Sequence, residues 1–203
     1  MLRFARFFSK VQETEWYGDF LSPIVDEVAR GAKVLDIGTG SGKLLQMMIH
    51  KKSIQATGLD TDQDMLDEAR QKLNGLKSRL VKINPEEDLP FEDGSFDAVS
   101  ICNLLFLLDS GDRDRLLQEA NRVTQPNGRI FVLTPTGKGS FSTMIKYGHY
   151  SIFIWFLATR SRASRWRQSG YLQAYALSHN LDYHSFDVLN GMGMFELVEA
   201  RSF

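Results

Sequence analysis

The sequence predicts one α/β domain over residues 1–203, built on a doubly wound, mostly parallel sheet. Short apolar runs alternate with segments of helical periodicity between residues 34 and 133, which is typical of parallel strands covered by helices on both faces. The pattern changes near the C-terminus, where only a glycine-rich turn separates two strand-like runs at 181–189 and 194–203. Such close spacing indicates an antiparallel hairpin.

Each expected element rests on a local pattern. The strands are the short apolar runs, at residues 34–37, 54–59, 80–83, 96–101 and 129–133. Helices are expected at 41–51, from Asp62 onward and at 113–123, and acids in the first turn after Asp62 suit the helix dipole. One or two further helices are expected within residues 1–31. A helical insertion is expected at 137–170, after the fifth strand.

The composition is that of an ordinary soluble protein, with 43% hydrophobic and 24% charged residues. Cys102 is the only cysteine, so a disulfide framework is excluded and a reducing cytoplasm is the simplest location. No apolar stretch is long enough to span a bilayer, and the N-terminus lacks the apolar core of a secretory signal.

Charge is distributed unevenly although the net charge is only −1. The region from Asp60 to Glu119 is rich in acids, whereas no acidic residue occurs between Glu119 and Asp182. That second stretch instead carries basic residues, which hint at an anionic partner or surface. They are Arg122, Arg129, Lys138, Lys146, Arg160, Arg162, Arg165 and Arg167.

A glycine-rich loop follows the first strand, at residues 36–42 with the sequence DIGTGSG. Glycines permit a tight turn and a close backbone approach to a ligand, and the helix N-terminus beyond them favours a carboxylate or phosphate. Asp60 ends the second strand, where nucleotide-binding folds place a carboxylate that accepts hydrogen bonds from ribose hydroxyls. A purely structural turn beside a surface aspartate is the alternative, but the loop, its flanks and Asp60 agree on a nucleotide site.

From Lys33 to Pro135 the chain resembles the class I, Rossmann-like family of S-adenosylmethionine-dependent methyltransferases. Four motifs carry the resemblance in the family's order and spacing: VLDIGTGSG at 34–42, GLDTD at 58–62, LPFEDGSFDAV at 89–99 and EANRVTQPNG at 119–128. The resemblance implies a seven-stranded sheet with an antiparallel last strand, S-adenosylmethionine as cofactor and S-adenosylhomocysteine as product.

The resemblance also implies roles for individual residues. Glycines of the loop would line the methionine part of the cofactor, Asp36 would lie near its amino group, and Asp60 would bind the ribose. Asn84 stands near the position where many relatives carry an aspartate that meets the adenine, and Asn127 replaces one glycine of a common pair. The full set of expected cofactor residues is Asp36, Gly38, Thr39, Gly40, Gly42, Asp60, Thr61, Asp62, Asn84 and Asn103. No metal ion is expected.

The leading functional hypothesis is methyl transfer to a small, apolar or anionic acceptor. A non-catalytic module that binds S-adenosylmethionine or a partner remains an alternative. A dinucleotide oxidoreductase is disfavoured, because the loop lacks the GxGxxG spacing. Methylation of nucleic acid bases is also disfavoured, because Asn103-Leu104-Leu105-Phe106 stands where a target-base motif such as NPPY would be. No catalytic base, acceptor or oligomeric state is indicated.

Several residues have open alternatives. His149 is either a base or a structural residue, and Trp16 and Tyr17 either close over the cofactor or fill the core. Cys102 is interpreted as a packed small hydrophobe. The aromatic and basic insertion at 137–170 is either packed helix with a solvated face, a substrate cap, or a surface that makes transient membrane contact. An amphipathic N-terminal segment is expected to dock on the domain, with membrane contact as the weaker alternative; its apolar side holds Phe4, Phe7, Phe8 and Val11.

Overall fold

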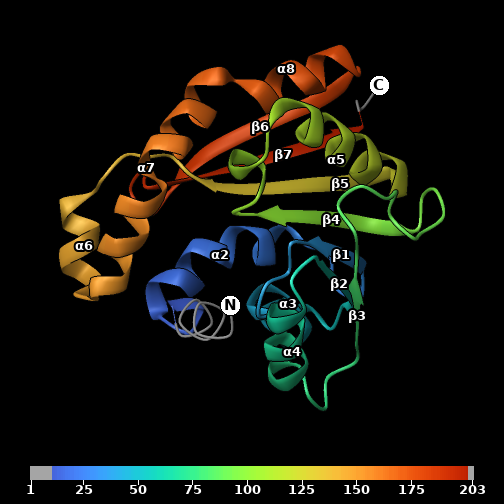
Figure 1. Cartoon of the computed structure of the whole chain (residues 1–203), viewed down its shortest axis with the longest axis horizontal. Helices are drawn as coiled ribbons and strands as arrows, with labels where there is room; N and C mark the ends of the chain where they lie inside the picture. Colours follow the sequence, from blue (N-terminus) through green and yellow to red (C-terminus); the bar gives the residue numbers. More distant parts are fainter. Residues whose placement is uncertain (1–10, 201–203) are drawn as a thin grey trace.

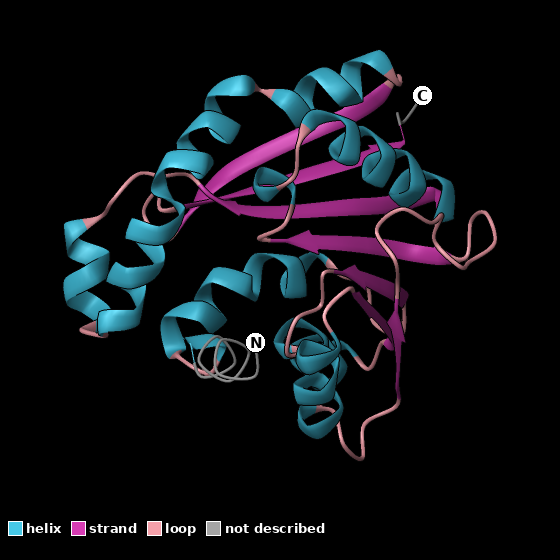
Figure 2. Ribbon diagram, in the orientation of Figure 1, coloured by secondary structure: helices cyan, strands magenta, loops and turns pink. Residues whose placement is uncertain are grey.

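A computed structural model describes residues 11–200 and contains one seven-stranded sheet (Figures 1 and 2). The strand order is β3-β2-β1-β4-β5-β7-β6. The first five strands in the chain run parallel, whereas β7 is antiparallel to both of its neighbours, β5 and β6. This confirms the predicted fold. The strands are β1 (Lys33–Ile37), β2 (Gln55–Asp60), β3 (Ser78–Lys82), β4 (Phe96–Cys102), β5 (Thr124–Pro135), β6 (Leu181–Val188) and β7 (Gly193–Ala200).

Helices cover both faces of the sheet. On one face α2 and α3 pack with β1 and β5, and α4 lies beside α3 (Figure 1). On the other face α5, α8 and the short 3-10 helix η1 form a second apolar core. The helices are α2 (Glu15–Glu27), α3 (Lys43–Lys52), α4 (Gln63–Lys72), η1 (Leu105–Leu107), α5 (Ser110–Val123), α6 (Phe141–Tyr147), α7 (Tyr150–Ser169) and α8 (Tyr171–Ser178).

The long helix α7 belongs to both cores. Its first half contributes Ile152 and Trp155 to the core that contains α2, whereas its second half contributes Ala163 and Trp166 to the core on the opposite face. The insertion is therefore helical, as predicted, and it extends from one layer of the fold to the other.

The end of α5 and the start of β5 differ from the sequence-based expectation. The sequence predicts that Asn127-Gly128 turns the chain into a strand that begins at 129, but β5 begins at Thr124 and includes both of these residues. The register with β4 shifts between Phe96 and Ala98. A side chain at Gly128 would come within 2.9 Å of the Asp97 carbonyl oxygen, so glycine is needed where the two backbones approach.

The helices differ from the prediction at one place and agree with it at two. The segment after Gly170 forms α8, which periodicity did not predict. Asp62 does begin a helix, as predicted, because its side chain accepts a hydrogen bond from the Asp64 N–H at the N-terminus of α4. A helix ahead of the sheet is confirmed by α2. Phe4, Phe7, Phe8 and the last residues of the expected final strand lie outside the described range.

Within residues 11–200, no helix has both the length and the apolar character that crossing a bilayer requires.

Candidate cofactor and active site

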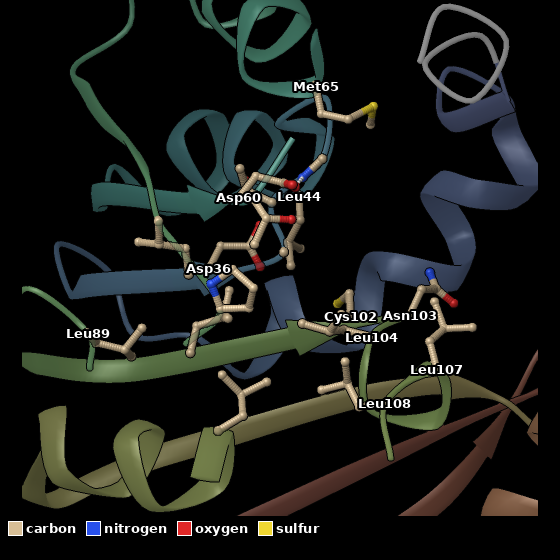
Figure 3. A pocket seen from close by; sticks show the side chains of 18 of the residues that line it. Asp36, Leu44, Asp60, Met65, Leu89, Cys102, Asn103, Leu104, Leu107 and Leu108 are labelled. Atoms are coloured by element: carbon tan, nitrogen blue, oxygen red, sulfur yellow. Dashed lines mark hydrogen bonds between the residues drawn. The ribbon is translucent and has the colours of Figure 1, made fainter. Parts of the chain in front are cut away.

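A cavity of about 680 Å³ lies at the carboxyl ends of β1, β2 and β4 (Figure 3). The strand order reverses between β1 and β4, and open α/β sheets bind ligands at such a switch point. Figure 3 shows the carboxylates of Asp36 and Asp60 close to one another on one wall, with Leu104, Leu107 and Leu108 on another. The cavity therefore combines an acidic wall with an apolar wall.

The glycine loop brings its backbone close to neighbouring elements. Gly38 and Gly40 have φ values of 75° and 55°, and an added side chain would lie 3.1 Å from Leu104 at the first and 3.2 Å from Met65 at the second. The N–H groups of Gly38 and Thr39 donate to the Leu59 carbonyl oxygen, at 2.9 and 2.8 Å. The loop amides thus fasten the end of β2 to the loop, and this fixes the position of Asp60.

Asp60 is held by backbone donors on both of its carboxylate oxygens. Oδ2 accepts from the Gly40 N–H and Oδ1 from the Asp62 N–H, each at 2.9 Å. An ionised carboxylate has about four acceptor sites, so roughly two remain for a ligand. Burial raises the pKa of Asp60, and the backbone hydrogen bonds oppose that rise. Asp60 therefore borders the cavity in a fixed position, with acceptor capacity left over.

Asp36 is almost fully buried at the end of β1. Its Oδ1 accepts a hydrogen bond from the Ser100 hydroxyl at 2.7 Å. Burial raises the pKa of Asp36 to about 6, although the hydrogen bond from Ser100 lowers it. The ionised form is costly to bury without a counter-charge, so this position favours a ligand that carries a positive charge.

A chain of polar contacts crosses the loop and reaches the end of β4. Lys72 donates to the Ser41 hydroxyl at 2.6 Å, and Ser41 donates to Gln12. The Gln12 amide in turn donates to the Tyr17 hydroxyl at 3.2 Å, and Asn103 donates to the same hydroxyl at 3.2 Å. This chain joins the segment before α2 to the loop and to β4.

Two buried polar atoms beside the cavity have no hydrogen-bond partner among residues 11–200: Thr39 Oγ1 and Asn103 Oδ1. Buried polar groups are rarely left unpaired in native proteins. Because both residues line the cavity, a polar ligand there would supply the missing partners. The acidic wall, the glycine loop and these two atoms fit a cationic, hydroxylated cofactor such as S-adenosylmethionine.

Tyr17 and Cys102 also line the cavity, and both are held in their neutral forms. Burial raises the pKa of each, and the nearby charge of Asp36 adds to the effect. Neither residue is therefore a phenolate or thiolate near neutral pH. This agrees with the interpretation of Cys102 as a packed hydrophobe.

Eight of the ten expected cofactor residues border the cavity, and their individual roles stay predictions. Asn84 is one of the eight and lies exposed at the rim, where its side chain contacts Glu86 and Glu87. Gly42 and Asp62 do not border the cavity: Gly42 precedes α3 in a left-handed conformation, and Asp62 caps α4. The eight are Asp36, Gly38, Thr39, Gly40, Asp60, Thr61, Asn84 and Asn103.

The open candidates of the insertion lie away from the cavity. His149 caps the start of α7, where its Nδ1 contacts the Ser151 hydroxyl at 2.7 Å and its ring stacks on Tyr150. None of residues 137–170 appears in the cavity lining, so the substrate cap stays a prediction. Sequence reasoning missed Gln12 and the leucine wall, since nothing in the sequence separates a cavity leucine from a core leucine. That wall consists of Leu104, Leu107, Leu108 and Leu116.

Comparison with known proteins agrees with this geometry. A family model described as a methyltransferase domain matches residues 34–128. A demethylmenaquinone methyltransferase of Thermotoga maritima is 31% identical over 129 residues, which cover 63% of this chain and 53% of that protein. A ubiquinone/menaquinone biosynthesis C-methyltransferase of Desulfotalea psychrophila is 30% identical over 163 residues, covering 77% of this chain and 61% of the relative.

A solved structure of a putative S-adenosylmethionine-dependent methyltransferase from Methanococcus maripaludis shares the fold, with a TM-score of 0.73 at 16% identity. The alignment covers 100% of this chain and 94% of that one. Fold, motifs and cavity together define a class I methyltransferase architecture. The chain has the fold of class I S-adenosylmethionine-dependent methyltransferases, and residues 34–128 are similar to a methyltransferase domain, which implies S-adenosylmethionine as the cofactor. It spans about half the length of the curated relatives it matches.

Proposed function

We propose that the protein transfers the methyl group of S-adenosylmethionine to a small, largely apolar acceptor. The observation that carries this proposal is the composition of one cavity, which has Asp36 and Asp60 on one wall and leucines on another. An acidic wall suits the positive charge and the ribose of the cofactor, and a leucine wall suits an acceptor with an apolar body.

The contribution expected of the chain is binding and alignment. S-adenosylmethionine, when bound, supplies a methyl group already activated by a positively charged sulfur. Asp60 is placed to orient the ribose and Asp36 to balance the positive charge, while the buried loop excludes water. Alignment of two reactants can lower a barrier by about 7–11 kcal/mol, so a strong catalytic dyad is not required.

No general base is assigned. Tyr17 and Cys102 are kept neutral by burial, and no histidine lines the cavity among residues 11–200. A base is needed only when the acceptor must lose its proton early in the reaction. An acceptor that is already ionised, or that is a reactive carbon of an electron-rich ring, would suit this site best.

The named relatives support an aromatic, lipophilic acceptor. Those of Thermotoga maritima and Desulfotalea psychrophila are named as methyltransferases of menaquinone or ubiquinone biosynthesis. The apolar cavity wall fits an acceptor of that kind. A cytoplasmic location stays a prediction.

Binding and transfer are tested separately. In calorimetry, S-adenosylmethionine and S-adenosylhomocysteine are expected to bind and NAD is not. Labelled cofactor is then incubated with the protein and with lipophilic or aqueous metabolite fractions, and label is expected in the lipophilic fraction. Micromolar NAD affinity without a response to either methionine nucleoside would overturn the assignment. Binding without transfer to any fraction would instead favour a non-catalytic module.

A further inference from the structure

The helical hairpin formed by α6 and the first half of α7 exposes large apolar side chains. Figure 1 shows these two segments side by side at one end of the molecule, and only Gly148 and His149 connect them. Phe141 is 80% exposed, Tyr150 65% and Ile145 63%. Phe153, Ile154 and Leu157 are also exposed. Isolated exposed apolar residues are common on soluble proteins, but six on two adjacent helices make this end of the molecule unusually apolar.

Helical spacing places the exposed residues of α7 on one face. Tyr150, Phe153, Ile154 and Leu157 recur at intervals of three and four, opposite the buried Ile152 and Trp155. The face that lies against the domain is therefore already occupied by the core. The outer face is apolar in the first two turns, and within the described residues nothing covers it.

The same outer face becomes basic toward the middle of α7. Arg160 and Arg165 are exposed on the two flanks of the apolar stripe, whereas Arg162 is exposed about 130° around the helix axis from the centre of that stripe. Within residues 11–200, none of these three arginines has a carboxylate within ion-pair distance. Residues 137–170 contain no acidic residue at all. The hairpin thus combines exposed apolar side chains with arginines that have no carboxylate partner among residues 11–200.

We propose that this face, which we call the docking face, binds an anionic lipid surface. It consists of Phe141, Ile145, Tyr150, Phe153, Ile154, Leu157, Arg160 and Arg165. Apolar residues that enter the lipid interface beside arginines that meet acidic headgroups are the two features of an interfacial helix. The proposal does not depend on methyl transfer, because lipid binding is measured without any acceptor.

A second copy of this chain fits the docking face less well. A two-fold symmetric dimer could bury the apolar side chains of each copy against the other. The docking face of the second copy would bring no carboxylate to the arginines, because residues 137–170 contain no acidic residue. A lipid surface with acidic headgroups supplies both an apolar layer and the negative charge that this segment lacks.

Co-sedimentation with vesicles tests the proposal. The full chain is mixed with vesicles of phosphatidylcholine alone or with about one third phosphatidylglycerol. Binding is expected only to the anionic vesicles, and it is expected to weaken as salt is raised. The variant Arg160→Gln, Arg165→Gln is expected to lose roughly tenfold or more of its partition coefficient. The variant Phe141→Ser, Ile145→Ser, Phe153→Ser is expected to lose a similar amount.

A matched control removes two positive charges elsewhere. Lys51 and Lys77 are exposed near β2 and β3, and their replacement by glutamine is expected to change vesicle binding less than twofold. The proposal fails if the native chain does not bind anionic vesicles, or if the control loses as much as the arginine variant. It also fails if sedimentation equilibrium shows a dimer that the serine variant converts to monomer, since the docking face would then be a protein interface.

Discussion

The cofactor cavity and the α6–α7 hairpin differ in what each leaves unsatisfied. Beside the cavity, the side chains of Thr39 and Asn103 have buried polar atoms with no hydrogen-bond partner among residues 11–200, and within the same residues no cationic side chain pairs with the buried carboxyl of Asp36. The hairpin instead leaves apolar side chains such as Phe141 in water. The unpaired buried polar groups of the cavity indicate a small polar, cationic ligand. The exposed apolar side chains of the hairpin indicate an extended apolar surface. The chemistry of the missing partner can thus be inferred from the groups that lack one.

The largest expected effect is on the free energy of unfolding. It tests whether the packing of the insertion can be disturbed without changing the cavity. Trp155 is buried, with its ring centroid 5.2 Å from that of Trp16 and 5.3 Å from that of Phe20. Trp155→Ala is expected to lower the free energy of unfolding by about 3–5 kcal/mol. Phe153→Ala, an exposed neighbour on the same helix, is expected to change it by no more than about 0.5 kcal/mol.

Denaturant unfolding measures these stability changes, and calorimetry at a temperature where both variants are folded measures S-adenosylhomocysteine affinity. That affinity is expected to change less than fivefold. A much larger loss of S-adenosylhomocysteine affinity in Trp155→Ala would mean that the insertion controls the cavity directly. The two regions could then not be treated as independent.

The next effect concerns the acidic wall. Asp60→Ala removes the acceptor that we propose for the ribose hydroxyls, and S-adenosylhomocysteine affinity is expected to fall about ten- to a hundredfold. Asp67→Ala on α4 is the control, because Asp67 is exposed and its ion pair with Arg70 lies at the surface. A folded Asp60→Ala protein with native affinity, measured by calorimetry, would remove Asp60 from the site.

A pH titration tests the buried charge of Asp36. The ionised carboxylate is the form that attracts a cationic cofactor, and the pKa of Asp36 in the free protein is about 6. Affinity for S-adenosylmethionine is therefore expected to be full above that pKa and to fall about tenfold from pH 7 to pH 5. The raised pKa of Asp60 acts in the same direction. Calorimetry on Asp36→Asn should give a weaker affinity with a shallower pH dependence; an unchanged profile would exclude Asp36 as its source.

The smallest expected effect lies outside both regions. Glu196 is buried in β7, where it accepts hydrogen bonds from Tyr183 at 2.8 Å and Trp166 at 3.3 Å, and burial raises its pKa from 4.5 to about 7. The folded state then holds this proton more tightly than the unfolded state, so stability is lost as pH rises from about 4.5 through 7. Glu196→Gln keeps an acceptor oxygen and cannot ionise.

Thermal unfolding of the native protein and of Glu196→Gln is compared at pH 5 and pH 8. At pH 8 the variant is expected to be more stable by on the order of 1 kcal/mol, or roughly 2–4 °C in Tm. At pH 5 that advantage is expected to disappear. A pH-independent difference between the two proteins would contradict the assignment of this proton to Glu196.

The sequence could predict the parts of the molecule whose conformation depends on residues close together in the chain. Apolar runs predicted the parallel strands, and the glycine loop predicted the turn that carries Gly38 and Gly40. Gln12 could not be found, because its contacts with Ser41 and Tyr17 depend on how distant segments meet. The bulge at Gly128 also escaped, since its cause is the approach of Asp97 from the neighbouring strand. The exposure of Phe153 could not be distinguished from the burial of Trp155 by composition alone.

Helix α2 limits how far this protein can be divided into modules. Trp16 and Tyr17 are consecutive, and their side chains therefore point about 100° apart around the helix axis. Trp16 donates to Ser151 of α7 at 2.9 Å, while the Tyr17 hydroxyl accepts hydrogen bonds beside the cavity. Residues 34–128 match a family model by themselves, yet a fragment that starts at 31 would leave the apolar sheet face under α2 open to water. We therefore expect residues 31–128 by themselves to be less stable than a chain that also contains α2.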